Sequence, residues 1–149
     1  MTRVSAAKYL GQLERQRTRL DMDEERLEHM RAKVYGASGF DYSRERVQTS
    51  SGKDQQSESV IRLMDFQKRV EEERQFYESV EDTITEQIGQ LSGSIESKLL
   101  FKIYVQFKTL RQAANEMCIS QSYAYRVHNR SLREFEKLYP ELYLFTQTG

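Results

Sequence analysis

Hydrophobic positions recur at helical spacing through most of the first thirty-five residues. Between Ser5 and about Tyr35 they return every three, four or seven positions, which places them on one face of a helix. This face consists of Leu10, Leu13, Leu20, Leu27, Met30 and Val34. Ser5 can cap the start of the helix, and Gly36 stands where a C-terminal cap belongs. The pattern therefore predicts one long amphipathic helix.

A second hydrophobic stripe predicts another long helix from about Glu58 to Leu91. Its members are Val60, Leu63, Phe66, Val70, Tyr77, Val80, Ile84, Ile88 and Leu91. Polar residues at Gln67, Arg74 and Glu81 interrupt the stripe, which favours an imperfect, coiled-coil-like antiparallel pairing of the two helices over a long parallel zipper. Pairing with the same helices of a second chain is the alternative, and the sequence leaves both open.

Two segments interrupt the helical pattern and divide the chain. Residues 36–57 are rich in Gly and Ser and have no clear period, so we expect a flexible loop or partly ordered linker there. Ser92, Gly93 and Ser94 form the second break, and Ser94 can cap the helix that follows. The sequence thus predicts a helical hairpin arm over residues 1–93 and a head over residues 94–149.

The head begins with a support helix from Ile95 to Phe107 and continues as a helix-turn-helix. Thr109 can cap a short helix whose inward positions are Leu110, Ala113, Ala114 and Met117. The small alanines would let two helix backbones approach closely. Cys118 stands in the turn at a position that often needs a positive φ and is often Gly, and Ile119 is expected to fill the core.

Ser120 can cap a final helix that ends near Leu138, before Pro140. Its expected inward positions are Ala124, Val127, Leu132, Phe135 and Leu138. Its early outward positions are Gln121, Ser122, Tyr123, Arg126, Asn129, Arg130 and Arg133, while Tyr125 lies between the two faces. We expect the apolar tail over residues 141–145 to fold back on the head or to contact a neighbouring molecule, because an exposed apolar cluster is unfavourable.

The outward residues predict a binding surface for double-stranded DNA. In a helix-turn-helix the N-terminal part of the second helix enters the major groove. There Gln121, Ser122, Tyr123 and Arg126 are expected to meet base edges. The expected phosphate contacts are Lys108, Thr109, Arg111, Arg130 and Arg133. Tyr125 could contact either bases or phosphates. The alternative for both Tyr123 and Tyr125 is that they face a protein partner.

Charge and composition agree with a long helical arm that carries a basic head. The chain is 38% hydrophobic and 31% charged, which suits helices that bury only one stripe. Its net charge is zero, yet residues 96–139 hold eight Lys and Arg against four Glu. A local charge of +4 favours a polyanion as the partner of the head.

The sequence offers no sign of catalysis, a metal or a cofactor. Cys118 is the only cysteine and is expected to be a small core residue, while His29 and His128 lack metal-ligand spacing. His128 is expected to be a surface or packing residue. There is no nucleophile–base pair or phosphate-binding Gly-rich loop, so an enzyme is not expected. No run of about 20 apolar residues occurs, so we expect a cytoplasmic protein without a membrane partner.

The residues of the head also resemble a known pattern. Tyr104 to Leu110, with Ala113–Ala114, Ile119–Ser120 and Arg126 to Leu132, is similar to region 4 of sigma-70-type factors, which reads the −35 promoter element. Over about residues 5–140 the chain resembles small phage and prophage proteins of Gram-positive bacteria, the ArpU- and RinA-type regulators of late genes. The string from Glu45 to Asp54 also looks like that family.

The resemblance implies sequence-specific control of phage or prophage transcription in the cytoplasm of a bacterial host. It further implies a helical arm that dimerises or contacts RNA polymerase. No counterpart of sigma region 2 is recognisable, so promoter melting is not expected. The alternatives are a packaging protein similar to a small terminase subunit, which would form rings of eight or more copies, and a coiled-coil adaptor that binds only protein.

Overall fold

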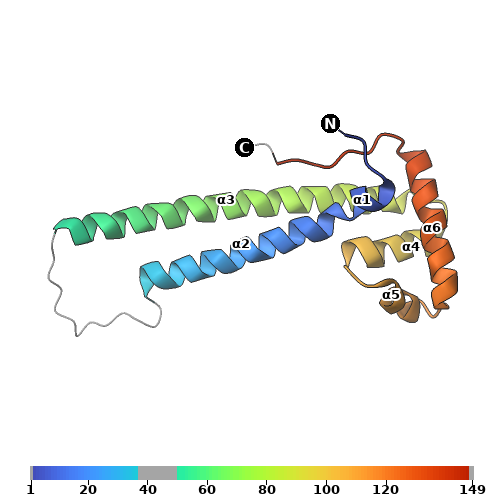
Figure 1. Ribbon diagram of the computed structural model, residues 1–149, viewed down its shortest axis with the longest axis horizontal. Coiled ribbons are helices and arrows are strands. Elements are labelled where there is room, and N and C mark those ends of the chain that lie inside the picture. The colour runs from blue at the N-terminus through green and yellow to red at the C-terminus, as the bar shows by residue number, and fades with distance from the viewer. Residues whose placement is uncertain (1, 37–49, 148–149) are drawn as a thin grey trace. The chain divides into compact units, whose positions relative to one another are not determined.

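The computed structural model of the protein describes residues 2–36 and 50–147. The regular elements within these residues are all helical and include no strand, which confirms the expected all-α class (Figure 1). The chain divides into two compact units, Met1–Arg17 with Phe76–Gly149 (unit 1) and Thr18–Gln75 (unit 2). The division at residue 93 that the sequence suggests stays a prediction.

The N-terminal helical segment has the caps that the sequence predicts, with one interruption. Helix α1 spans Ala6–Leu10, and the Ser5 side chain accepts a hydrogen bond from the Lys8 backbone N–H. The expected continuous helix is broken at Gly11, after which α2 runs over Gln12–Tyr35. Gly36 has a φ of 59°, and its N–H donates to the Ala32 carbonyl. It therefore ends α2 as a left-handed cap.

Helix α3 spans Ser50–Gly89, so it begins earlier than the predicted start near Glu58. The later part of the expected loop over residues 36–57 is therefore helical, and its residues 37–49 lie outside the described residues. Gly52 opposes a helix there, but the Lys, Asp and Gln residues that follow it are compatible with one. A single Gly and several Ser residues were thus given too much weight in the prediction.

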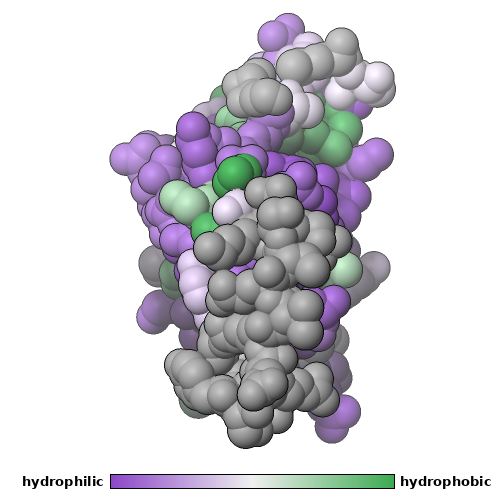
Figure 2. Space-filling model, turned by 90° about the vertical axis from the view of Figure 1, so that its left-hand side faces the viewer, coloured by the Kyte–Doolittle hydropathy of each residue, from purple (hydrophilic) through white to green (hydrophobic). Residues whose placement is uncertain are grey.

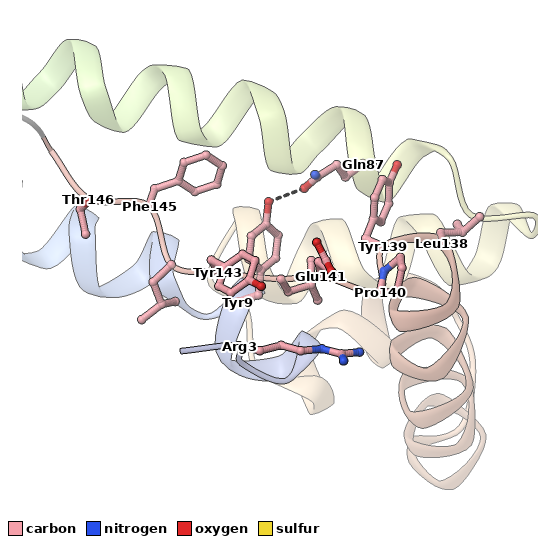
Figure 3. Close-up of a pocket in the computed structure, with 12 residues that line it drawn as sticks. Arg3, Tyr9, Gln87, Leu138, Tyr139, Pro140, Glu141, Tyr143, Phe145 and Thr146 are labelled. Atoms are coloured by element: carbon pink, nitrogen blue, oxygen red, sulfur yellow. Dashed lines mark hydrogen bonds between the residues drawn. The ribbon is translucent and has the colours of Figure 1, made fainter. Parts of the chain in front are cut away.

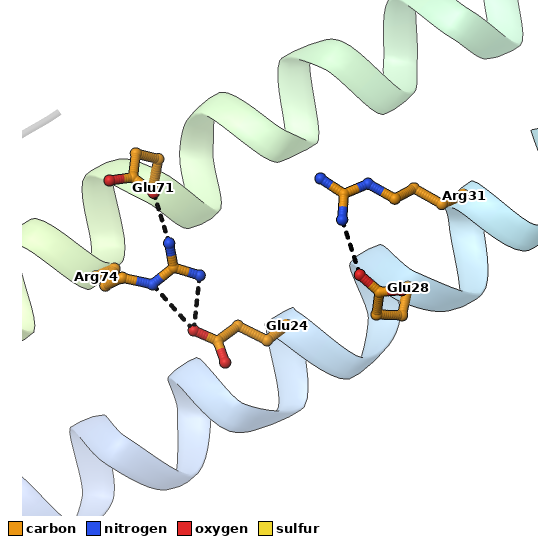
Figure 4. A network of polar contacts seen from close by, with 5 residues as sticks. All are labelled: Glu24, Glu28, Arg31, Glu71 and Arg74. Atoms are coloured by element: carbon orange, nitrogen blue, oxygen red, sulfur yellow. Dashed lines mark hydrogen bonds and ion pairs between the residues drawn. The ribbon is translucent and has the colours of Figure 1, made fainter.

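Unit 2 contains α2 from Thr18 to its C-terminal end and the first part of α3, as far as Gln75. Its buried apolar residues are Leu20, Leu27, Leu63, Phe66 and Val70. Arg74 joins the two helices, because its Nε and Nη2 lie 3.2 and 3.0 Å from Oε1 of Glu24 (Figure 4). Its Nη1 also pairs with Glu71 at 2.6 Å. Outside the grey residues, the surface in Figure 2 is mainly hydrophilic, with hydrophobic residues in scattered groups.

Unit 1 contains α1, the start of α2, the end of α3 and the four elements that follow. These four are α4 (Ser94–Leu100), the π-helical turn η1 (Phe101–Val105), α5 (Leu110–Glu116) and α6 (Gln121–Leu138). Helix α6 contacts α1, α4 and α5. A cluster of Leu99, Ala113, Ala114, Ala124 and Val127 forms the core between them, and each of these residues is at most 1% exposed. The small residues permit close helix approach, as the sequence predicts.

The C-terminal tail of unit 1 folds back onto residues near the N-terminus, whereas the sequence predicts that it folds back on the head or contacts a neighbouring molecule. Leu142 is buried, and its carbonyl accepts a hydrogen bond from the Val4 N–H. The Phe145 N–H donates to Gln12 Oε1, and the Tyr9 hydroxyl donates to Gln87 Oε1 at 2.6 Å (Figure 3). The tail and residues near the N-terminus thus line one side-chain cluster with the end of α3.

Several local predictions in unit 1 are wrong. Ser94 is the first residue of α4, and Gly93 is its N-cap. The support helix changes from α to π geometry at Phe101, and it ends before Phe107, which has a φ of 61°. Leu138, the last residue of α6, is 45% exposed instead of inward.

Candidate nucleic-acid interface

Helices α5 and α6 meet through a short turn whose geometry follows from its sequence. Cys118 has a φ of 58°, which confirms the expected positive value, but its side chain is exposed and the expected core position is wrong. Ile119 packs against the core, and its N–H donates to the Ala114 carbonyl. In a left-handed turn residue the side chain can project to solvent while its neighbour supplies the apolar contact.

Both helices begin on the predicted capping residues. The Thr109 hydroxyl accepts from the Gln112 N–H, and Gln112 Oε1 accepts from the Thr109 N–H, which together form a capping box. The Ser120 hydroxyl accepts from the Tyr123 N–H at 3.1 Å. These caps satisfy N–H groups that the helices themselves leave unpaired. They also set the point where each helix starts, and so which side chains face outward.

The first turns of α6 expose most of the residues assigned to base edges. Gln121, Ser122 and Arg126 are exposed, Tyr125 is 59% exposed, and these four line a shallow hollow with Leu110 of α5. Tyr123 is half-buried and packs against the core between the helices. The N-terminal part of α6 thus has an accessible polar face beside the start of α5.

Two arginines and a tyrosine form a cluster on α6 together with one acid from α4. The Arg126 guanidinium carbon lies 5.9 Å from the centroid of the Tyr123 ring. Arg130 Nη2 lies 2.5 Å from Glu96 Oε1. Hydrogen bonds to Glu96, and after it to Tyr123, raise the pKa of Arg130 above its usual value. The sequence had selected the three α6 residues but not the acid.

The acidic side chains of α6 are hydrogen-bonded to backbone groups of neighbouring segments. Glu134 Oε1 accepts from the Ser92 N–H at 2.7 Å, which lowers the pKa of that carboxyl group. Glu136 Oε1 accepts from the Ala6 N–H at 2.9 Å. Within residues 2–36 and 50–147, Arg126 and Arg133 have no acidic side chain at ion-pair distance, and both are exposed. Arg126 and Arg133 are therefore two exposed cations of α6 without an ion-pair partner among the described residues.

The residues assigned to phosphates around α5 are placed less uniformly. Thr109 and Arg111 are exposed. Lys108 is half-buried, and its Nζ lies 2.6 Å from Glu116 Oε1, which Lys102 Nζ also approaches at 3.0 Å. Both lysines lower the pKa of Glu116. Lys108 is thus tied within the protein to α5, a contact that the sequence analysis missed.

Next to this face, His128 of α6 packs on Tyr104 of η1. The rings are stacked at 5.8 Å, and the tyrosine hydroxyl lies 2.8 Å from His128 Nε2. Burial lowers the pKa of His128 and raises the pKa of Tyr104, so the neutral forms of both are favoured. His128 is accordingly the packing residue that the sequence predicts, and the neighbouring Asn129 is half-buried.

Glu96 and Glu116 were not detectable as partners because their contacts are not local. Glu96 is the third residue after the α4 cap, where acids are favoured, but its partner is 34 positions away. In the part of the chain that the structure describes, no group of three or more His, Cys, Asp and Glu is arranged to hold a metal ion. Nor does any described helix have the length and apolar character needed to span a membrane.

Comparisons of the chain with protein-family models, with curated proteins and with solved structures found no match. The resemblance to phage regulators therefore remains a prediction from the residues of the head. What supports a function is the α5–α6 geometry, with its capped helices and its exposed basic face.

Proposed function

We propose that the protein is a sequence-specific DNA-binding regulator of phage or prophage transcription. In this proposal α5, the turn at Cys118 and α6 form a helix-turn-helix similar to sigma region 4, and α6 enters the major groove. In the same proposal, α2 and α3 form a helical hairpin arm that dimerises or contacts RNA polymerase. Regulation follows from occupancy of a DNA site and needs no chemical step.

The observation that carries the proposal is the charge of the outer face of α6. Arg126 and Arg133 of α6 are exposed without an acidic partner among the described residues. Phosphate contacts from such cations supply most of the affinity of a DNA-binding protein. A face with this charge therefore suits a duplex.

Individual residues have distinct roles in the proposal. Arg126 stands one turn into α6, beside Gln121 and Ser122, where it can pair with two acceptors of a guanine. Gln121 can pair with an adenine in the same way. Arg130 and Arg133 lie further along α6 and contact phosphates, which positions the helix without reading sequence.

The experiment is selection of a DNA site from random duplexes, followed by affinity measurements at several salt concentrations. Arg126→Ala is expected to weaken binding to the selected DNA site by about 1–3 kcal/mol and to relax the preference for one base pair. Arg130→Ala is expected to weaken binding to all DNA sequences alike. It is also expected to reduce the slope of log affinity against log salt concentration by roughly one. Lys8→Ala, which removes a cation from the exposed side of α1, is the matched control.

The results separate specific recognition from general attraction to a polyanion. Failure of the selection to enrich any sequence, or equal binding by wild type and Arg126→Ala, would contradict the assignment of α6 to the major groove. The expected affinity of a single head is low and falls with salt, because it makes few phosphate contacts. Two heads joined through the arm gain affinity through effective concentration.

A further inference from the structure

The contact between Arg130 and Glu96 places an internal carboxylate on a cation of the proposed DNA-binding face. The two groups come from different helices, α6 and α4, and meet through a single hydrogen bond from Nη2 to Oε1. Arg130 is 52% exposed and Glu96 only 14% exposed. The arginine therefore reaches solvent, whereas the carboxylate lies beneath it.

The position of the carboxylate depends on the absence of a side chain at Gly93. A Cβ built at Gly93 would overlap Oε2 of Glu96, so the glutamate folds back over the start of its own helix. One oxygen of Glu96 faces this glycine while the other faces Arg130. The local fold of α4 thus holds the negative charge in place below the arginine.

We propose that Glu96 is an affinity-determining residue of the DNA interface, which holds Arg130 in the free protein and is replaced by a DNA phosphate in the complex. This inference rests on the proposed DNA-binding function. A guanidinium has five N–H donors in a planar fork and binds a phosphate oxygen pair as readily as a carboxylate. A partly exposed ion pair is weak enough for such an exchange.

The exchange predicts that Glu96 lowers the affinity of the protein for DNA. Binding of DNA must break the contact between Glu96 and Arg130, and the carboxylate remains close to the incoming phosphate. Glu96→Gln keeps the shape of the side chain and removes both effects. We expect it to bind the selected DNA roughly two- to five-fold more tightly than wild type, the range that an exposed ion pair gives.

A double-mutant cycle distinguishes this exchange from simple charge repulsion. In an Arg130→Ala background, Glu96→Gln is expected to increase affinity less than it does in the wild-type background, because the ion pair is already absent and only the repulsion between the carboxylate and the phosphate is left to remove. Glu141→Gln, which removes an equal charge from the exposed tail, is the matched control and is expected to bind as wild type does. Thermal unfolding of each variant shows whether it is folded.

A second variant removes the contact without changing the charge of the protein. Gly93→Ala retains an accessible backbone conformation, since φ and ψ are −104° and 138°, but its Cβ would overlap Glu96 Oε2, so the carboxylate has to leave the position in which it meets Arg130. We expect it to bind DNA more tightly than wild type as well. Equal binding by Gly93→Ala and wild type would overturn the role of the contact.

The remaining outcomes separate this inference from the proposed function. Specific DNA binding by wild type with unchanged or weaker binding by Glu96→Gln overturns the inference alone. An equal gain from Glu96→Gln with and without Arg130 also overturns it, because the acid would then act only through long-range repulsion. Absence of DNA binding by wild type and all variants overturns both.

Discussion

The turn between α5 and α6 contains a backbone conformation that its residue does not favour, and its replacement should stabilise the protein. Cys118 has a φ of 58° and an exposed side chain. A residue with a Cβ pays roughly 1–2 kcal/mol for this left-handed conformation, whereas Gly does not. Cys118→Gly should therefore relieve strain and lose almost no buried surface.

The expected net gain is smaller than the strain because Gly also changes the unfolded chain. The greater conformational freedom of Gly in the unfolded chain offsets about 0.4–1 kcal/mol of the stabilisation that relief of the strain provides. We expect Cys118→Gly to raise the free energy of unfolding by about 0.5–1 kcal/mol, or the unfolding temperature by roughly 1–4 °C for a chain of this size. Thermal and urea unfolding followed by circular dichroism, in reducing buffer, measures both quantities.

Two further variants make this expectation refutable. Cys118→Ala keeps the Cβ and should remain within about 0.5 kcal/mol of wild type. Phe107 also has a positive φ, 61°, but its side chain is half-buried. The free energy lost with its apolar contacts should exceed the relief of backbone strain, so Phe107→Gly should destabilise the protein. A Cys118→Gly protein no more stable than both wild type and Cys118→Ala would refute the strain argument.

Other predictions concern the cap of α6 and the pH dependence of the two units. Ser120→Ala should lower the free energy of unfolding by about 1 kcal/mol, measured by urea unfolding, because the Tyr123 N–H loses its acceptor. Burial holds the pKa of His128 below its usual 6.5, so its contribution to stability should be lost as pH falls below about 6.5; His128→Gln should remove that loss. In unit 2, burial and then the neighbouring Asp23 raise the pKa of Glu73 to about 7, so its contribution should be lost as pH rises from about 4.5 through 7. Glu73→Gln should match wild type at pH 4 and be more stable than it at pH 8, and equal stability at pH 8 would contradict this assignment.

Local signals in the sequence predicted three helix caps and the turn between α5 and α6. The capping residues Ser5, Thr109 and Ser120 act where expected, because a cap hydrogen bond spans only a few residues. The positive φ at Cys118 and the close packing through Ala113 are likewise set by side-chain size and turn geometry. These features depend on neighbours along the chain.

Predictions failed where the outcome depends on competition between weak local preferences. The early start of α3 at Ser50 and the break at Gly11 each involve differences of about 1 kcal/mol in helix propensity. The π-helical turn at Phe101 has no compositional signal, since its hydrogen bonds differ from those of an α-helix by one residue in spacing.

The sequence by itself determined that this protein is helical, that Ser5, Thr109 and Ser120 cap three of its helices, and that the arginines of α6 lie on its exposed side. Only the tertiary structure decided the electrostatic state of that face. It brought Glu96 to Arg130, Glu116 to Lys108, and the Ala6 N–H to Glu136. Periodicity reports which side of a helix a residue occupies, whereas the charge it meets there depends on a segment that folding brings from far along the chain.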